Sequence, residues 1–343
     1  MLLHGRHWTR RELDMHVGRL EQLGGIRHYT LDEGPERGVE CIEVRTGAGL
    51  AFTVVPTKGL DFSLAEYGGT ALSWQSAGGD IHPVYYEAEG AGWLRTASGG
   101  LMMTCGLMNA GIPSEYEGRS LGLHGRIHHT PARQVAAEGC WDGDEYDMTI
   151  RGTVVETALF GGHLRLHREI RARMGENRIR VSDRIENAGF EAVPYLLLYH
   201  FNFGYPLLSP ETEIRFPRGT VEPREDETPL DGYDRWQPPE PGYRERVYYH
   251  APEPAAAAEV SLFQPNFPQA GGRTVPLALT LAWTADTLPR LVQWKLPGAG
   301  AYVLGIEPSN CGVEGIAAEA EEGRLHMLQP GETVRCGWEL NIS

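Results

Sequence analysis

The chain has 343 residues, of which 41% are hydrophobic and 22% charged, and its formal net charge is −15. This composition is typical of a globular protein with an ample core, and the negative charge disfavours nucleic acid and anionic membranes as partners. The five cysteines are odd in number and form no C-x-x-C pair, the N-terminus soon becomes charged, and no apolar run of 18 residues occurs, so we expect reduced thiols and a cytoplasmic protein.

One helix is predicted at the beginning of the chain. Thr9 and Glu12 form a capping-box pattern, and Leu13, Val17 and Leu20 recur on one face. We expect this helical segment to occupy residues 1–25 and to end near the two glycines at positions 24 and 25.

Beyond residue 25 the chain consists of short β-rich runs, which predict an all-β protein. The runs are 39–44, 50–55, 146–155, 164–170, 178–185, 193–199, 277–283, 291–296, 302–306 and 333–342. Residues 206–276 are rich in Pro, Glu and Gly and are predicted to form long loops. No change of composition divides the chain, so we expect a single domain over residues 1–343, a large β-sandwich with a short N-terminal helix.

The runs 164–170 and 178–185 predict a hairpin with one solvated face, because apolar and polar residues alternate along both. Residues 175–177 have turn chemistry. Arg168 and Asp183 fall on the apolar side of their strands, where they could face each other as an opposite-charge pair.

Two histidines lie in contexts that suit chemistry. His124 stands between glycines, which permit close approach of a ligand; alternatively, it is a turn histidine that caps a carbonyl. His200 and Asn202 follow an apolar run among aromatic residues, where rings suit the flat face of a sugar. A hydrogen-bonded core histidine is the competing interpretation for His200.

Glu307 follows the apolar run 302–306, at the expected mouth of a strand. Partial burial there would raise its pKa toward that of a general base, whereas a glutamate bonded to backbone amides is the alternative. Arg126, Arg95 and Lys58 are candidates for binding substrate oxygens, or else surface charges.

Other chemistries find no support in the sequence. His128 and His129 lie near His124 in a Gly/Pro-rich loop, without a helix to align them as metal ligands, so no metal is expected. Nucleotide-binding and serine-hydrolase motifs are absent, and no cofactor is predicted.

Several short motifs resemble those of the aldose 1-epimerase (galactose mutarotase-like) superfamily, and in particular a bacterial branch of it. They are Pro-Thr-Lys-Gly-Leu-Asp at 56–61, Thr-Cys-Gly-Leu-Met-Asn at 104–109, Leu-His-Gly-Arg at 123–126, Gln-Trp-Lys at 293–295 and Gly-Ile-Glu-Pro-Ser-Asn at 305–310. The resemblance implies a β-supersandwich with an open sugar cleft and a small-molecule carbohydrate as the partner.

The same resemblance implies roles for individual residues. His124 and His200 would be the two family histidines and Glu307 the base, so that the enzyme interconverts sugar anomers by opening and reclosing the ring. The implied substrate-binding residues are Arg126, Arg95, Asn109, Lys58, Asp61, Asn202 and Trp294, with Lys58 and Asp61 on a rim and Trp294 stacked on the sugar.

The sequence departs from the galactose mutarotases around both histidines, since Leu121-Gly-Leu precedes His124 and His200 lies between Tyr199 and Phe201. The sugar is therefore left open. A non-catalytic carbohydrate-binding protein remains an alternative, as does a lyase or hydrolase, although ordinary glycoside hydrolysis needs a second carboxylate. No feature of the sequence indicates the oligomeric state.

Overall fold

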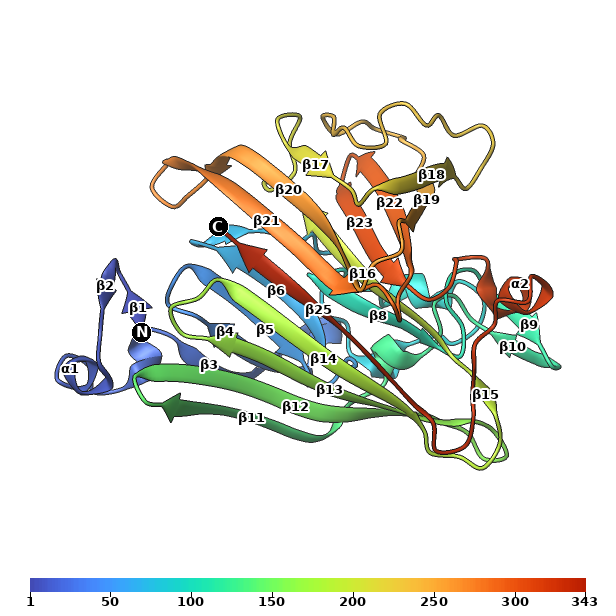
Figure 1. The fold of residues 1–343 in the computed structure, drawn as a ribbon, viewed down its shortest axis with the longest axis horizontal. Coiled ribbons are helices and arrows are strands. Elements are labelled where there is room, and N and C mark those ends of the chain that lie inside the picture. Colours follow the sequence, from blue (N-terminus) through green and yellow to red (C-terminus); the bar gives the residue numbers. More distant parts are fainter.

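Two large antiparallel sheets face each other and build most of the protein (Figure 1). The computed structural model describes residues 1–343, with 51% of them in strands and 8% in helices. The predicted all-β class is confirmed.

The eight-stranded sheet is built mainly from the middle and the end of the chain. In spatial order its strands are β11 (Arg133–Asp142), β12 (Glu145–Thr157), β13 (His163–Arg173), β14 (Arg178–Asn187), β25 (Thr333–Ile342), β21 (Thr274–Thr284), β20 (Ala257–Pro268) and β17 (Glu213–Arg215).

The eleven-stranded sheet lies behind it in Figure 1. Its strands are, in spatial order, β18 (Gly219–Pro223), β19 (Arg246–Pro252), β22 (Arg290–Gly298), β23 (Ala301–Ser309), β16 (Leu196–Gly204), β8 (Met102–Leu107), β6 (Asp61–Tyr67), β5 (Leu50–Val55), β4 (Glu40–Arg45) and β3 (Gly25–Thr30), with β7 (Thr70–Ala71) beside β6.

The remaining elements are short. Three small two-stranded sheets pair β1 (Leu2–Leu3) with β2 (Arg6–His7), β9 (Ser114–Tyr116) with β10 (Arg119–Leu121), and β15 (Val193–Pro194) with β24 (Met327–Leu328). The helices are α1 (Arg10–Asp14) and α2 (Gly315–Glu321), with 3-10 turns at Leu20–Gln22, Gly34–Glu36, Pro83–Tyr85, Gly92–Arg95 and Ile127–His129. No helix is both long and apolar enough to cross a membrane.

Helix α1 is much shorter than predicted. Its capping box between Thr9 and Glu12 is present, but the helix ends at Asp14. Gly18 interrupts the pattern with a poor helix former, and only Leu13 of the predicted apolar face is buried. Gly25, with φ of 129°, then begins β3.

The prediction of long loops over residues 206–276 is wrong for much of that segment. It contains β17 to β20 and the beginning of β21. In β20, Ala258, Val260 and Leu262 are buried while their neighbours face outward, and this alternation outweighs the local content of Pro and Glu. Each β-rich run predicted elsewhere overlaps a strand, and the runs 50–55 and 333–342 match β5 and β25 in full.

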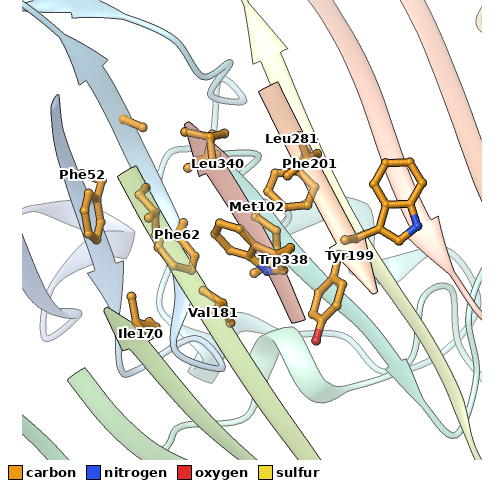
Figure 2. Close-up of a cluster of buried hydrophobic side chains, with 14 of the residues drawn as sticks. Phe52, Phe62, Met102, Ile170, Val181, Tyr199, Phe201, Leu281, Trp338 and Leu340 are labelled. Atoms are coloured by element: carbon orange, nitrogen blue, oxygen red, sulfur yellow. The ribbon is translucent and has the colours of Figure 1, made fainter. Parts of the chain in front are cut away.

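The core fills the space between the two sheets. Phe62 of β6, Phe201 of β16 and Trp338 of β25 pack together there, with the ring of Trp338 5.1 Å from Phe62 and 4.9 Å from Phe201 (Figure 2). Tyr199 and Phe203 of β16 also point into this core. Because side chains alternate along a strand, His200 and Asn202 must point to the outer face of the eleven-stranded sheet.

The predicted pair of Arg168 and Asp183 is confirmed. The two residues stand opposite each other on β13 and β14, and Arg168 Nη2 lies 2.6 Å from Asp183 Oδ2 with both side chains fully buried. All five cysteines are free thiols, and only Cys140 is exposed.

Candidate active site

His200 and Glu307 form a buried acid/base pair on the outer face of the eleven-stranded sheet. In the register of β16 and β23, Leu198 pairs with Ser309 and Phe201 with Ile306, so His200 stands directly opposite Glu307. His200 Nε2 lies 3.3 Å from Glu307 Oε1, and the residues are 7% and 2% exposed. Both residues lie within their strands rather than at the strand ends that the sequence suggested.

Burial opposes the charged form of each partner. It lowers the pKa of His200 to about 4. It also holds the pKa of Glu307 well above its ordinary value, with a smaller contribution from the Glu245 carboxylate. The pair therefore favours a neutral imidazole beside a protonated carboxyl, a state that holds one transferable proton.

Gly305 makes room for the Glu307 carboxylate. It precedes Glu307 by two residues on β23 and so shares its face. A Cβ at position 305 would lie 2.6 Å from Glu307 Oε1 and 2.8 Å from Trp294 Cβ. Only glycine at position 305 therefore leaves room for the Glu307 carboxylate and the Trp294 side chain to pack against this part of the sheet.

His124 approaches the pair from the loop that precedes the 3-10 turn at Ile127–His129. Its ring centroid lies 5.9 Å from that of His200, and its backbone has a φ of 54°. The Gly111 amide donates to His124 Nδ1 at 3.3 Å, so the neutral ring carries its proton on Nε2. Burial and then the neighbouring His200 lower the pKa of His124 to about 3.

Indole rings surround the three ionisable side chains. Trp294 of β22 lies edge-on to His200, at a centroid distance of 5.6 Å, and to Trp74, at 6.2 Å. Trp93 lies 4.9 Å from the His124 ring. Trp294 Nε1 donates to Glu245 Oε2 at 2.8 Å, which fixes the indole at the edge of the site.

Asn109 and Asn202 hold the frame of the site. The amide of Asn109 donates to the carbonyls of Ile112 and Gly122, and its oxygen accepts from the Ile316 amide at 2.9 Å. Asn202 Nδ2 donates to Gly100 O and to His200 O. These contacts occupy the whole side-chain amide of Asn109 but only the nitrogen of Asn202, whose Oδ1 is buried without a hydrogen-bond partner.

Lys58 and Asp61 do not lie on a rim, because both are buried. Lys58 Nζ donates to Thr96 O at 2.9 Å, and burial lowers its pKa to about 8. Asp61 accepts from Thr104 and Arg168 and lies 2.6 Å from His128 Nδ1. The sequence carried no signal that these polar groups pair with partners from distant strands.

Arg95 and Arg126 both have exposed side chains. Arg95 Nε lies 3.1 Å from Glu87 Oε1. Arg126 directly follows Gly125, whose carbonyl accepts from the Tyr86 hydroxyl at 2.9 Å. The structure thus brings together His124, His200, Glu307 and Trp294 among the predicted residues, and leaves the two arginines at the surface.

No prediction from the sequence named the other residues of the site, which are Trp74, Trp93, Glu245 and Gly305. Trp74 and Trp93 lie outside the long strands, so no periodic pattern marks them. Gly305 does lie in the motif at 305–310, and its position two residues before Glu307 was the one available signal.

The fold is similar to that of several solved structures. A Klebsiella pneumoniae protein, provisionally named an aldose 1-epimerase, matches with a TM-score of 0.81 and 25% identity over 92% of this chain and 83% of that chain. Galactose 1-epimerase from Lactobacillus acidophilus matches with a TM-score of 0.58 and 11% identity, over 93% and 98% of the two chains. A galactose mutarotase-like protein from Clostridium acetobutylicum matches with a TM-score of 0.57 and 10% identity, over 94% and 99%.

This chain therefore shares the galactose mutarotase-like fold of the aldose 1-epimerases. Residues 36–342 match a family model, and the chain belongs to that family, which is described as a domain of unknown function, DUF4432. None of the curated proteins matches the sequence.

Proposed function

We propose that the protein is an isomerase that interconverts the anomers of a free sugar by general acid/base catalysis. The observation that carries this proposal is the placement of His200 Nε2 and Glu307 Oε1 3.3 Å apart on adjacent strands, beside His124 and Trp294. An acid and a base within one site can catalyse the ring opening of a hemiacetal, because this step removes a proton from the anomeric hydroxyl and supplies another to the ring oxygen.

The reaction needs one proton in the pair. Hydroxyl groups of a bound sugar would solvate the Glu307 carboxylate and shift the shared proton to His200. Glu307 then takes the proton of the anomeric hydroxyl as the bond between C1 and the ring oxygen breaks, and His200 supplies a proton to that oxygen. Rotation about the C1–C2 bond and reclosure by the reverse transfers yield the other anomer and restore the pair.

The groups around the pair suit the transition state. His124, whose Nδ1 accepts from the Gly111 amide, keeps an Nε2–H donor that can stabilise negative charge on a sugar oxygen without the ring itself becoming charged. The indole of Trp294 offers an apolar surface for the sugar ring. Removal of water by the buried setting strengthens each of these interactions.

The test is proton NMR of freshly dissolved single anomers from a panel of aldoses, deoxysugars and uronic acids, at slightly acidic pH, where spontaneous exchange is slow. We expect faster interconversion of at least one sugar and its loss in Glu307→Gln. Glu259→Gln, an exposed change on β20, should leave the rate unchanged. Circular dichroism of each variant checks that the fold is retained.

Other outcomes would redirect the assignment. Interconversion that persists in a folded Glu307→Gln variant contradicts the proposed role of Glu307. Saturable sugar binding without any acceleration would instead assign a carbohydrate-binding protein. Release of two sugars from a disaccharide would assign a hydrolase, with Glu245, whose charge contributes to the raised pKa of Glu307, as the second carboxylate to examine.

A further inference from the structure

Two buried polar atoms on the outer face of β16 have no conventional hydrogen-bond partner. They are His200 Nδ1 and Asn202 Oδ1. The two residues are 7% and 0% exposed, and they lie two positions apart on the same face of the strand. Because an unpaired polar atom in a buried setting is costly, their proximity points to a shared role.

The orientation of the Asn202 amide is determined by two carbonyl groups. Its Nδ2 lies 3.1 Å from Gly100 O and 3.0 Å from His200 O and donates to both. Turning the amide over would place Oδ1 against these two oxygens, neither of which can donate. Both hydrogens of the amide are therefore used, and Oδ1 remains available as an acceptor.

The His200 ring leans along the sheet toward Asn202. Gly305 of β23 stands opposite Asn202, yet a Cβ on Gly305 would lie 3.4 Å from His200 Cε1, the carbon between the two ring nitrogens. His200 Nε2 lies 3.3 Å from Glu307 Oε1. Nδ1 is therefore the ring nitrogen that is left to interact with Asn202.

Only one tautomer of the neutral His200 ring satisfies all of these groups. With the proton on Nδ1, the ring can donate to Asn202 Oδ1 while Nε2 accepts from the protonated Glu307 carboxyl. With the proton on Nε2, Nδ1 and Asn202 Oδ1 would be two acceptors without a donor between them. Burial lowers the pKa of His200, and the Asn202 side chain opposes this effect as a hydrogen-bond partner of the ring.

We infer that Asn202 is a positioning residue that holds His200 as the Nδ1–H tautomer and thereby leaves Nε2 free to accept the proton of Glu307. The catalytic consequence rests on the proposed isomerase function, whereas the tautomer does not. When the shared proton moves from Glu307 to Nε2, the ring becomes a cation whose Nδ1–H remains bonded to Asn202. The cation then gives the Nε2 proton to the sugar ring oxygen and returns to the same neutral tautomer.

A neutral acceptor at position 202 keeps the basicity of the ring low. A carboxylate beside Nδ1 would raise the pKa of His200, and the ring would then release a proton to a sugar oxygen less readily. We therefore expect Asn202→Asp to retain the tautomer but to raise the pH at which His200 titrates above the value of about 4 in the wild type.

NMR of the imidazole nitrogens near neutral pH tests the tautomer without any sugar. Correlations to the ring carbon protons show which nitrogen carries the hydrogen, and His200→Gln identifies the signals of His200. We expect Nδ1–H for His200. His250 and His124 are internal controls that should carry Nε2–H, because His250 Nε2 lies 2.9 Å from Gln293 Oε1 and His124 Nδ1 accepts from a backbone amide.

Two variants separate the role of Oδ1 from that of Nδ2. Asn202→Leu removes both atoms, whereas Asn202→Asp keeps an oxygen acceptor and loses the amide donor. Asn202→Leu should lose the preference for Nδ1–H and lower kcat for anomer interconversion roughly 100-fold, with little change in KM. Asn202→Asp should lower kcat less. Asn266→Leu, an exposed change on β20, is the control and should alter neither the tautomer nor the rate.

The outcomes distinguish a positioning role from a purely structural one. A wild-type His200 ring that carries its proton on Nε2 would overturn the inference, whether or not any variant folds. Equal losses of kcat in folded Asn202→Asp and Asn202→Leu would also overturn it, because a residue that only braces the backbone loses its donor in both. An Nδ1–H ring in a protein that interconverts no anomers would support the Asn202 contact while contradicting the proposed function.

Discussion

Gly305 is the residue that sets how closely Glu307 approaches its partners. We expect Gly305→Ala to move the Glu307 carboxylate away from His200, because the added Cβ would lie 2.6 Å from Glu307 Oε1. A misplacement of about 1 Å at a reacting group costs roughly 100-fold in rate. Anomer interconversion followed by NMR provides the measurement.

Gly18→Ala is the matched control for this change, because its Cβ would meet nothing within 4 Å. It should interconvert anomers at the wild-type rate. If Gly305→Ala also remained as active as the wild type, the close packing around Glu307 would not matter to the reaction.

Sequence patterns identified which ionisable residues lie in the candidate site, but they did not reveal which partners a polar residue contacts in the fold. His124, His200 and Glu307 stood out because each is an ionisable group beside an apolar run or between glycines. Lys58 and Asp61 were assigned to substrate binding by the family resemblance, yet they bond to partners within the core. Local sequence does not reveal whether a polar side chain meets a partner from a distant strand, and Asp61 meets Arg168 across 107 positions.

At the scale of strands, Arg168 connects the two sheets. From β13 it contacts Asp183 on β14 and Asp61 on β6, and its Nη2 donates to Thr104 Oγ1 on β8. We expect Arg168→Met to lower the free energy of unfolding by about 3–5 kcal/mol, because two buried carboxylates lose their counter-charge. Urea denaturation measures the change.

Arg173→Met gives the comparison on the same strand. Arg173 pairs with Asp147 at 2.6 Å, but both side chains are more than one-third exposed. Loss of such a surface pair should cost less than about 1 kcal/mol. Similar effects of the two substitutions would show that the buried network contributes little to holding the sheets together.

The predicted elements were most accurate where alternation was regular and pairing was local. The hairpin of β13 and β14 followed from its own period and its turn at 175–177. Strands β17 to β20 were missed because Pro and Glu in the same segment obscured a period of two, although β17 pairs with β20 and β18 with β19 within that segment. Helix α2 has no side-chain cap at its N-terminus, so the usual start signal was absent.

For the whole molecule, buried histidines make folding sensitive to acid. Burial lowers the pKa of His129 to about 2 and of His200 and His250 to about 4. As the pH falls below the unfolded value of about 6.5, the unfolded chain binds protons that the folded chain does not, so stability decreases. Glu156, whose pKa burial raises to about 7, acts in the opposite sense over the range between about 4.5 and 7.

His250 allows one such contribution to be isolated. It is 4% exposed, stacks on Phe216, and its Nε2 lies 2.9 Å from Gln293 Oε1. Between about pH 7.5 and pH 5 the free energy of unfolding of the wild type should fall by about 2 kcal/mol more than that of His250→Phe. Urea titrations at the two pH values measure the difference, and parallel losses would contradict it.

The direct cross-strand pairing of His200 and Glu307 has a consequence for how this site can change. Their separation is set by the hydrogen-bonded spacing of neighbouring strands, about 4.8 Å, and not by any loop. In the proposed isomerase, that spacing would match the part of a sugar ring on which both groups act. If the site has the proposed function, the surrounding loops can change during evolution to admit other sugars while the distance between acid and base stays constant.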